Sequence, residues 1–470
     1  MAPFRPERGG RKLGASTLRT LDVDELVDGQ KLGWFSFNLL LWSFLAMFAD
    51  GYDISVMPFA APALSKLWHI GPKLLTPLLT ASNYGVLLGA PLLGYVGDRF
   101  GRKTAIIAGS TIVGLSTLGV MAVAAPWPAV ALRFLGGVGI GGLMPNTIAL
   151  NSELSPKRRR ATLVVLMFTG ITLGSGTPGL IAAYLLPHYG WRALFVLGGA
   201  VPLAVAGCLG VALPESIKFL ARQPARRAQA AALARRLRPE LAGEDIEIAP
   251  GPAQVSSGLG LGQILGPGFR FITPLLWACF CMALMANYFL NTWMPLLYTS
   301  AGLPAKQAAL ASSLYHVGGT VGGLLISVLL DRAGMVVIAA LFLAAVPVVA
   351  AIGASAVSFA ALAPLSLAAG LAVLGAQFGN NASAGLLYPT AFRSKGVGWA
   401  LAVGRLGSIV GPTVGGILIA RHWSMQRLFV AASVPMVVGA VAGLALVWLC
   451  WRRLGELRLS DVPRSGRAVA

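Results

Sequence analysis

The chain has 470 residues, of which 56% are hydrophobic and 11% are charged, and its mean hydropathy is +0.73. This apolar content exceeds what a soluble core of that length needs, which excludes an ordinary water-soluble enzyme or binding domain and makes a lipid bilayer the expected solvent. The formal net charge of +20 would suit nucleic acid, but the placement of the basic residues argues against that partner.

Apolar runs long enough to cross a membrane as helices recur twelve times along the chain. With both termini placed in the cytoplasm, the loops on that side carry about 29 of the 37 Lys and Arg residues, so the positive charge encodes orientation. Residues 1–31 are expected to be a cytoplasmic tail, because the apolar run that follows is too long for a signal peptide. The expected spans are 32–56, 75–97, 104–124, 127–150, 161–186, 192–213, 271–299, 307–330, 335–353, 357–384, 396–420 and 427–451.

The first span ends in MFADGYDISVMPFAAP, which places Asp50 and Asp53 among apolar residues. A charge near mid-bilayer costs about 2.5–3.5 kcal/mol, so such residues are expected to face a wet cavity or each other. Their spacing puts both on one helical face, and Gly51 lets a neighbouring helix come close. Two carboxylates this close do not both ionise readily, so we predict that they take up and release a proton as a coupled unit. The alternative is that they only neutralise a nearby arginine.

The segment around the loop after the second span recurs at an offset of 233 residues, where GVLLGAPLLGYVGDRFG lies over GGTVGGLLISVLLDRAG. The repeat predicts an all-α membrane protein with two parallel six-helix halves, residues 32–213 and 271–451. The residues that coincide include Asp98 with Asp331, Arg99 with Arg332, Gly101 with Gly334, Pro156 with Pro389, Arg160 with Arg393 and Gly174 with Gly407.

The repeat separates charges that the halves share from charges that they do not. The shared Asp and Arg residues lie at cytoplasmic span ends, where they can pair with a neighbouring helix and latch that side of the protein. Charges inside the spans have no charged counterpart in the other half, which makes them better candidates for chemistry. These are Asp50, Asp53, Arg133 and Arg405.

Arg133 lies in the outer half of the fourth span at a depth similar to that of Asp50, and a salt bridge between the two is predicted. Pairing with Asp50 alone is the alternative to a role in binding substrate. The nearby GVGIGG, residues 137–142, resembles a dinucleotide-binding loop. It lies within an apolar helix with no preceding strand, so close helix packing explains it better.

The longest polar interval, residues 214–270, divides six spans from six and is expected to be a cytoplasmic linker. Its RQPARRAQAAALARRLRPE stretch is predicted to form a short basic helix along the inner membrane surface. Residues 452–470 are expected to be a cytoplasmic C-terminal tail.

Several residues of the second half are candidates for lining a cavity. Asn380 and Asn381 of the tenth span either donate to a substrate or bond across helices. His316 of the eighth span either carries a proton or is an interhelical histidine with its hydrogen bonds satisfied. The aromatic side chains that could stack on a ring, or simply pack, are Tyr288, Trp293, Phe378 and Trp399.

The stretch GRLGSIVGP places Arg405 about halfway along the eleventh span, between Gly404 and Gly407. A guanidinium group is always charged and can hold a carboxylate with two hydrogen bonds, so a role in anion binding is predicted. The alternative is a structural arginine bonded to backbone carbonyls freed near Pro412.

Several stretches resemble one known family. GYVGDRFGRK resembles the loop signature of the major facilitator superfamily, and ADGYDISVMPFAAPAL is similar to its aromatic acid:proton symporter branch. The similarity covers residues 21 to about 450, and the superfamily signature alone is unspecific. The stretches that extend it are RFLGGVGIGGLMPNTIALNSELSPKRRRA, LPESIKFL, NYFLNTWMPLLYTSAGL and LLYPTAFRSKGVGWALAVGRLGSIVGP.

The resemblance implies uptake of small aromatic carboxylates, such as benzoate or hydroxybenzoates, with protons across a bacterial inner membrane. It implies proton coupling by Asp50 and Asp53. The loop LLDRAGMVV of the second half lacks the basic residues after Gly334, which predicts a weaker latch there. The expected substrate-binding residues are Arg133, Arg405, Asn380, Asn381, Tyr288, Trp293 and Phe378. The expected latch residues are Asp98, Arg99, Gly101, Arg102, Glu153, Arg160, Asp331 and Arg332.

Other functions remain open on the sequence. An efflux antiporter, or a symporter of other small organic anions, would use the same fold and the same acidic pair. A membrane sensor or enzyme would need a sizeable soluble domain or a nucleophile–base pair, and neither is visible. The four cysteines lie in apolar segments, so neither a disulfide framework nor a metal site is expected. No cofactor is expected, and the protein is expected to act as a monomer in the bilayer.

Overall fold

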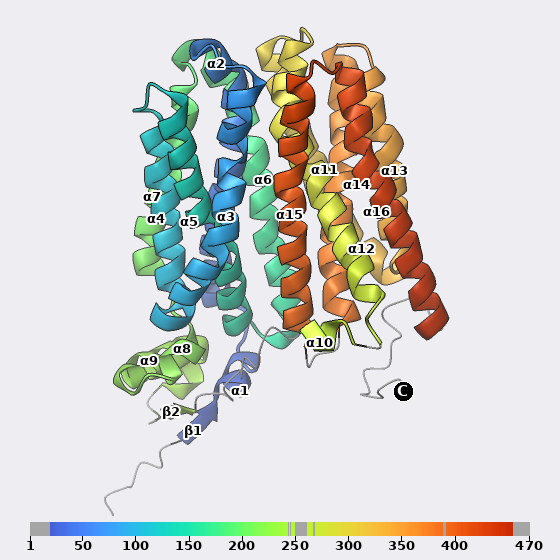
Figure 1. The fold of residues 1–470 in the computed structure, drawn as a ribbon. Coiled ribbons are helices and arrows are strands. Elements are labelled where there is room, and N and C mark those ends of the chain that lie inside the picture. Colours follow the sequence, from blue (N-terminus) through green and yellow to red (C-terminus); the bar gives the residue numbers. More distant parts are fainter. Residues whose placement is uncertain are drawn as a thin grey trace, which may run out of the picture.

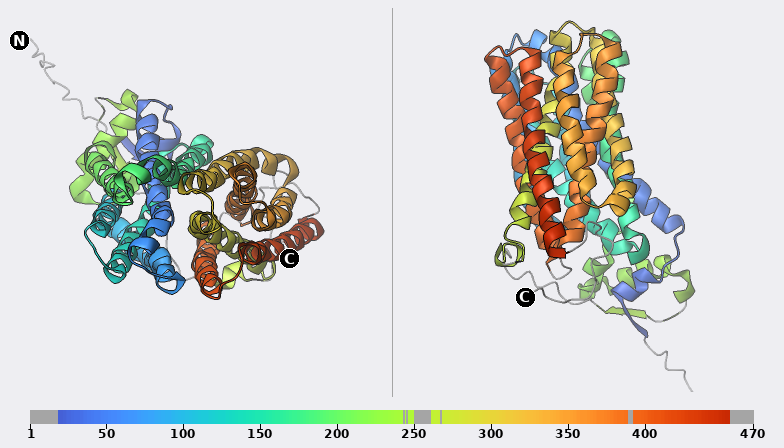
Figure 2. Two further views of the ribbon diagram at one scale, coloured as in Figure 1. Left: turned by 90° about the horizontal axis from the view of Figure 1, so that it is seen from above. Right: turned by 90° about the vertical axis from the view of Figure 1, so that its right-hand side faces the viewer.

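The computed structural model describes residues 19–242, 244, 246–249, 261–266, 268–388 and 392–454. In this described part, twelve long helices stand side by side as two groups of six (Figures 1 and 2). Eleven of them are long and apolar enough to cross a membrane, and the other, α3, packs against α5 and α15. Their bounds are α2 (Trp34–Leu67), α3 (Pro72–Phe100), α4 (Arg102–Val120), α5 (Pro126–Leu154), α6 (Lys157–Tyr189), α7 (Arg192–Ala212), α11 (Ile272–Ser300), α12 (Ala305–Ala333), α13 (Val336–Ala354), α14 (Phe359–Leu387), α15 (Arg393–Ala420) and α16 (Met425–Leu454).

The helix bounds follow the internal repeat. Moving α3 by 233 residues gives the bounds of α12, and moving α5 by the same offset gives those of α14. The packing repeats as well, because the pairs α2–α6, α3–α5 and α4–α7 correspond to α11–α15, α12–α14 and α13–α16. The predicted all-α fold with two six-helix halves is therefore confirmed.

Each half brings two of its helices together at one equivalent glycine. A Cβ atom on Gly174 would lie 2.1 Å from the carbonyl oxygen of Phe48, and one on Gly407 would lie 2.1 Å from that of Cys281. Gly51 lies equally close to the backbone of Ile171, as its position in the first span suggested. The close approach of α2 to α6 and of α11 to α15 therefore requires residues without a side chain.

The end of the bundle where α2 begins, here called the tail end, carries a small folded unit (Figure 1). In it, the strand of the N-terminal tail, β1, pairs in parallel with β2, which follows the first half in sequence. The opposite end of the bundle is called the far end. The short elements are β1 (Arg19–Asp22), α1 (Val23–Asp28), α8 (Ile217–Ala221), η1 (Pro224–Arg226), α9 (Arg227–Leu237), η2 (Pro239–Leu241), β2 (Ile246–Ala249) and α10 (Leu261–Ile264).

The predicted basic helix exists as α9, and its place along the inner membrane surface stays a prediction. Its apolar side is buried against α1, α8 and β2, a packing that the sequence did not predict. The reason is that the N-terminal tail covers it, and the four residues of β1 give too short a pattern to be recognised in the sequence. The buried residues of α9 are Ala230, Leu233, Ala234 and Leu237.

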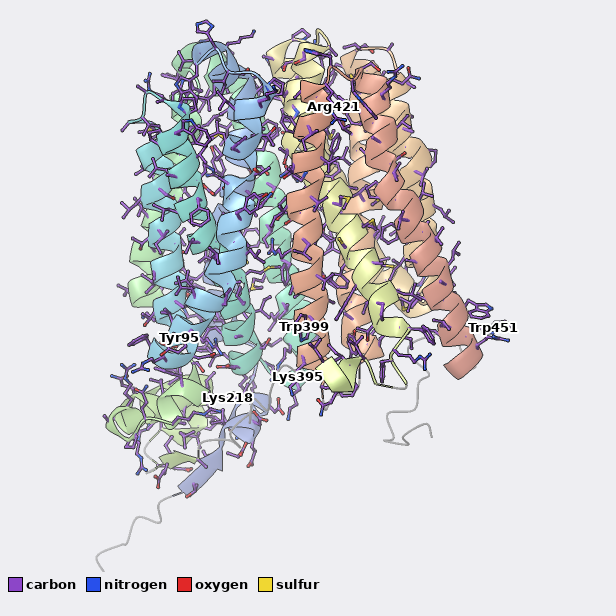
Figure 3. The ribbon with its side chains drawn as sticks, in the orientation of Figure 1. Tyr95, Lys218, Lys395, Trp399, Arg421 and Trp451 are labelled. Atoms are coloured by element: carbon purple, nitrogen blue, oxygen red, sulfur yellow. The ribbon has the colours of Figure 1, made fainter. Side chains whose placement is uncertain are left out.

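Ion pairs fasten the tail to the first half. Asp24 Oδ1 lies 2.9 Å from the Nζ of Lys218, which is labelled in Figure 3, and Asp28 Oδ2 lies 3.0 Å from the Nζ of Lys157 at the start of α6. Arg238 Nη2 donates to the backbone oxygen of Glu25 at 2.7 Å. The tail, α8 and α9 therefore belong to the first half.

Acid should loosen this attachment through Asp24. The hydrogen bond from Lys218 holds the pKa of Asp24 below its ordinary value of 3.8. A carboxylate with a lowered pKa stabilises the folded unit above its ordinary pKa, and this stabilisation disappears as the pH falls through the lowered value. We expect pepsin cleavage within residues 19–28 to speed up below about pH 4, and Asp24→Asn to be cleaved faster than the wild type above that pH. A Glu25→Gln control that behaves like Asp24→Asn would contradict this role.

The two halves touch at mid-height and toward the far end. Helix α12 packs along α6, α15 packs along α3, and α11 packs on α2. Nearer the far end, Gly416 faces Thr76 so closely that a Cβ atom would lie 1.9 Å from its Oγ1. Hydrogen bonds between described residues of the two halves join Ser55 to Asn291, Thr320 to Thr172 and Asn83 to Ser408.

Candidate functional site

A buried ion pair lies inside the first half. Asp53 on α2 and Arg133 on α5 are 0% and 2% exposed, and Arg133 Nη1 donates to Asp53 Oδ1 at 2.8 Å. Arg133 Nη2 also donates to the backbone oxygen of Asp53 at 2.9 Å, and Thr117 Oγ1 on α4 donates to Oδ1 at 2.5 Å. These two donors on one carboxylate oxygen fix α2 against α4 and α5.

The predicted salt bridge between Asp50 and Arg133 was wrong, because Arg133 pairs with Asp53 instead. The two carboxylates are one helical turn apart, and the rotation of α2 decides which of them faces α5. Asp50 is 2% exposed, and its Oδ1 has no hydrogen-bond partner among the described residues. The charged groups that act on it are Arg405 and Asp53. Burying a carboxylate anion without a partner is costly, so Asp50 is suited to bind a proton.

Arg405 extends from α15 into the space between the halves. Its Nη1 donates to the Tyr288 hydroxyl at 3.2 Å, and its Nη2 lies 3.5 Å from Met144 Sδ on α5 of the other half. Both contacts are neutral, and Arg405 makes no salt bridge with a described carboxylate. Its positive charge is therefore available to an anionic ligand.

The alternative for Arg405 was a structural bond to backbone carbonyls freed near Pro412. Pro412 frees the carbonyl of Ser408, one turn earlier, and this oxygen accepts from Asn83 Nδ2 at 3.0 Å. The carbonyl of Pro412 itself is also bonded to another residue than Arg405. It accepts a hydrogen bond from Trp293 Nε1 at 2.9 Å, and Trp293 is 0% exposed. The indole ring therefore fills the space between α11 and α15. The expectation that Trp293 contacts substrate is corrected by this burial.

A cavity between the halves adjoins these charges. Polar and apolar side chains from both halves line it, and its volume in this conformation is about 10 Å³, room for about one water molecule. Tyr288, the partner of Arg405, is among them, as sequence reasoning expected. The lining residues are Ile54, Leu79, Ser82, Asn83, Val86, Ile140, Tyr288, Asn291 and Thr292.

Three other predicted substrate-binding residues lie on α14, away from this lining. Phe378 is half-buried against Gly323 of α12, where a Cβ atom would meet its ring at 2.7 Å. Asn380 is 1% exposed, with no partner for its Nδ2 among the described residues, and Asn381 is half-buried. Of the predicted site residues in the described part of the chain, only Tyr288 lines the cavity; Arg405 is bonded to the Tyr288 hydroxyl, and Asp50 lies one helical turn from the lining residue Ile54.

The loop charges of the first half form contacts within that half. Asp98 Oδ1 pairs with Arg102 Nη2 at 2.5 Å, and Arg102 Nη1 donates to Asn146 Oδ1 on α5 at 3.2 Å. Arg99 instead donates to the hydroxyl of Tyr95, labelled in Figure 3, at 2.9 Å on its own helix. The predicted pairing across to a neighbouring helix is therefore found for Arg102 and is wrong for Arg99, whose side chain turns outward.

A carboxylate that the sequence reasoning missed completes this loop. Glu215 Oε1 accepts from the backbone N–H groups of Lys103 and Ser216 at 3.2 and 2.8 Å, so it caps the start of α4. Burial raises the pKa of Glu215, although the backbone N–H groups oppose that shift. Ser216 also donates to Glu153, which links the end of α5 to the same corner.

Gly101 is required at this corner for two reasons. Its φ is 108°, a conformation that side chains disfavour, and a Cβ atom would lie 2.1 Å from Glu215 Oε2. We expect Gly101→Ala to destabilise the protein by about 1–2 kcal/mol or more. Thermal unfolding of the purified protein in detergent would measure the loss. Gly94→Ala is the matched control, because Gly94 lies in α3 with open space around it, and equal melting temperatures would refute the requirement.

The remaining latch residues make fewer contacts. Arg160 Nη2 donates to the backbone oxygen of Ser155 at 3.3 Å, and Arg332 is exposed at the end of α12. The side chain of Asp331 lies outside the described residues. The contacts of the first-half latch residues described above all lie within that half.

Three residues at the site were missed in the sequence. Thr117 carried no signal, since single hydroxyl residues are common in apolar helices. Asn291 stands one helical turn from Asn287 on α11, and this spacing of two amides in a span could have marked it. Glu215 lies in LPESIKFL, a polar break directly after the sixth span, where a helix cap is a reasonable expectation.

Comparison with known proteins places the chain among transporters. The model of the Major Facilitator Superfamily matches residues 43–382. A protein of Pseudomonas putida named gallate transporter is 33% identical over 428 residues, which are 90% of this chain and 95% of the relative. The 4-hydroxybenzoate transporter PcaK of the same organism is also 33% identical, over 90% of this chain and 95% of its own. A benzoate transport protein of Acinetobacter baylyi is 30% identical over 90% of this chain and 92% of its own.

Solved structures share the fold at lower sequence identity. The xylose transporter XylE of E. coli, in a partially occluded inward-open conformation, superposes with a TM-score of 0.67 at 17% identity. The match covers 90% of this chain and all of that one. A crystal structure of a D-xylose–proton symporter gives a TM-score of 0.65 at 17% identity, over 87% of this chain and 97% of that one.

Proposed function

Because the chain belongs to the Major Facilitator Superfamily, we propose that it is a secondary transporter that takes up small aromatic carboxylates together with protons. One observation carries the proposal: Asp50 is a buried carboxylate without a hydrogen bond at Oδ1, Arg405 has no carboxylate partner among the described residues, and the cavity between the halves is lined by Tyr288, the partner of Arg405, and by Ile54, one helical turn from Asp50. The relatives are named as transporters of gallate, 4-hydroxybenzoate and benzoate, and these names support aromatic carboxylates as the substrate class.

In the proposed cycle, Asp50 takes up a proton before substrate binds. Protonation removes the negative charge that Arg405 faces, so the guanidinium can hold the substrate carboxylate with two hydrogen bonds. A proton and a monoanion together add no net charge, which makes movement of the loaded protein through the apolar region inexpensive. Asp53 keeps its contact with Arg133 and so holds α2 in place.

The contacts between the halves suggest which side is closed. The contacts named above lie at mid-height and toward the far end, which supports a conformation closed on the far side. The positive-inside bias places the tail end in the cytoplasm of a bacterial cell, with the protein in the inner membrane. The conformation is then the one that releases substrate inside. Loading requires the far-end contacts to separate.

Purified protein in liposomes tests the proposal directly. With an acidic outer solution, labelled 4-hydroxybenzoate should accumulate inside faster and further than in protein-free liposomes, which the uncharged acid enters by diffusion, and a protonophore should abolish this difference. Reversing the pH gradient should drive the labelled acid outward. A protein that neither binds nor moves aromatic acids under any gradient would overturn the proposal. Movement of the acid against the direction of the proton flow would instead indicate an antiporter.

A further inference from the structure

Asn291 lines the cavity on α11, on the same helical face as Tyr288, the partner of Arg405. Its side chain is buried, with 8% of its surface still exposed. Residues three apart on a helix have Cβ atoms about 5–6 Å apart, which is comparable to the size of a benzene ring. Tyr288, which holds Arg405, and Asn291 line the same cavity, so we place the ring of an aromatic acid whose carboxylate is held at Arg405 on the side of Asn291.

Two hydrogen bonds fix the orientation of the Asn291 amide. Its Oδ1 accepts from Ser55 Oγ on α2 at 3.1 Å, and it lies 3.0 Å from Nε2 of His316 on α12, which donates in the Nε2–H tautomer. These donors occupy the amide oxygen. The two N–H bonds of Nδ2 have no partner among the described residues, so they are left to the cavity.

The neighbouring Asn287 shows the opposite arrangement. Its Oδ1 accepts from the Tyr315 hydroxyl at 2.9 Å, and its Nδ2 donates to Gln377 Oε1 at 2.9 Å. Both ends of this amide are used inside the second half, so it has little to offer a ligand. The two asparagines are one turn apart on α11, which makes Asn287 a matched control for Asn291.

We propose that Asn291 determines specificity by donating a hydrogen bond from Nδ2 to a polar ring substituent of the aromatic acid, such as a hydroxyl group. This inference rests on the proposed function of the same site. Ser55 and His316 are positioning residues in it, because they hold the amide oxygen and so point the N–H groups inward. The role of His316 is then to orient Asn291 through an interhelical hydrogen bond.

The test compares benzoate with 4-hydroxybenzoate as competitors of labelled substrate bound to the purified full-length protein. In the wild type the hydroxylated acid should bind more tightly, and Asn291→Leu should reduce that preference by about tenfold while benzoate affinity changes little. Asn291→Asp is the second variant in case Asn291→Leu does not fold. It keeps an oxygen for Ser55 and His316 but removes the donors, so it should lose the same preference.

Each result of these binding measurements either supports or overturns the role of Asn291. Asn287→Leu should leave the ratio of the two affinities unchanged, and an equal loss in that variant would overturn the role of Asn291. An unchanged ratio in the folded Asn291 variants would also overturn it. A wild type that binds neither acid would overturn the proposed function itself, which separates that failure from a failure of the specificity role.

Discussion

Asp50→Asn is expected to abolish proton-driven accumulation of substrate while exchange of labelled for unlabelled substrate continues. Asparagine has nearly the shape of the protonated acid and cannot release a proton, so substrate movement is no longer tied to the pH gradient. One pH unit supplies about 1.4 kcal/mol, enough for roughly tenfold accumulation by the wild type with one proton. The variant should only equilibrate its substrate. Uptake and counterflow in the same liposomes measure both quantities.

Asp22→Asn is a suitable control, because it removes an exposed carboxylate of the tail outside the bundle. It should accumulate substrate as the wild type does. If Asp50→Asn still concentrates substrate when pH is the only driving force, Asp50 does not carry the proton.

Asp53→Asn should behave differently, because it leaves the Arg133 cation buried without its partner. Its main effect should be a loss of stability of about 3–5 kcal/mol.

Arg405→Lys is expected to raise the half-saturating substrate concentration by at least about tenfold, with a smaller effect on the maximal rate. Lysine keeps the charge but cannot form two parallel hydrogen bonds to a carboxylate, and bonds to charged groups contribute roughly 1.5–3 kcal/mol each. Concentration-dependent uptake under a fixed pH gradient measures both parameters. Arg405→Gln should lose more, because the positive charge disappears as well.

Arg421→Lys is the matched control for this substitution. Arg421 follows the last residue of α15 at the far end, where Figure 3 labels it, and it is exposed. Its replacement should leave the half-saturating concentration unchanged. Benzamide, a neutral analogue of benzoate, should compete equally well with the wild type and with Arg405→Lys. Wild-type affinity of Arg405→Lys for benzoate would reject the role in anion binding.

The fold was largely predictable because membrane spans are set by length and hydropathy, which are local properties. The offset of 233 residues, found by aligning the Asp98 and Asp331 loops, relates the observed bounds of α3 and α5 to those of α12 and α14, whereas hydropathy alone predicted spans at 307–330 and 357–384. The pairing of β1 with β2 was not predictable, because a four-residue strand carries no pattern and its partner lies beyond six spans. The burial of α9 depends on that pairing and was missed for the same reason.

The site was predictable in its residue types and only partly in its contacts. Charges within apolar spans correctly marked the buried interior, since such residues need a partner or water. Whether Asp50 or Asp53 meets Arg133 depends on the rotation of α2, which packing fixes and composition does not. Trp293 fits both a cavity and a core by sequence, and only its bond to Pro412 shows which environment it has.

The parallel pairing of β1 with β2 has a consequence for the order of events during synthesis. Residues 19–22 leave the ribosome first but find their partner only when residues 246–249 have been made. At about 5–20 residues per second, the delay is roughly ten to fifty seconds, in which all six helices of the first half can insert. The closing of this short sheet therefore marks the completion of the first half before the second begins to emerge.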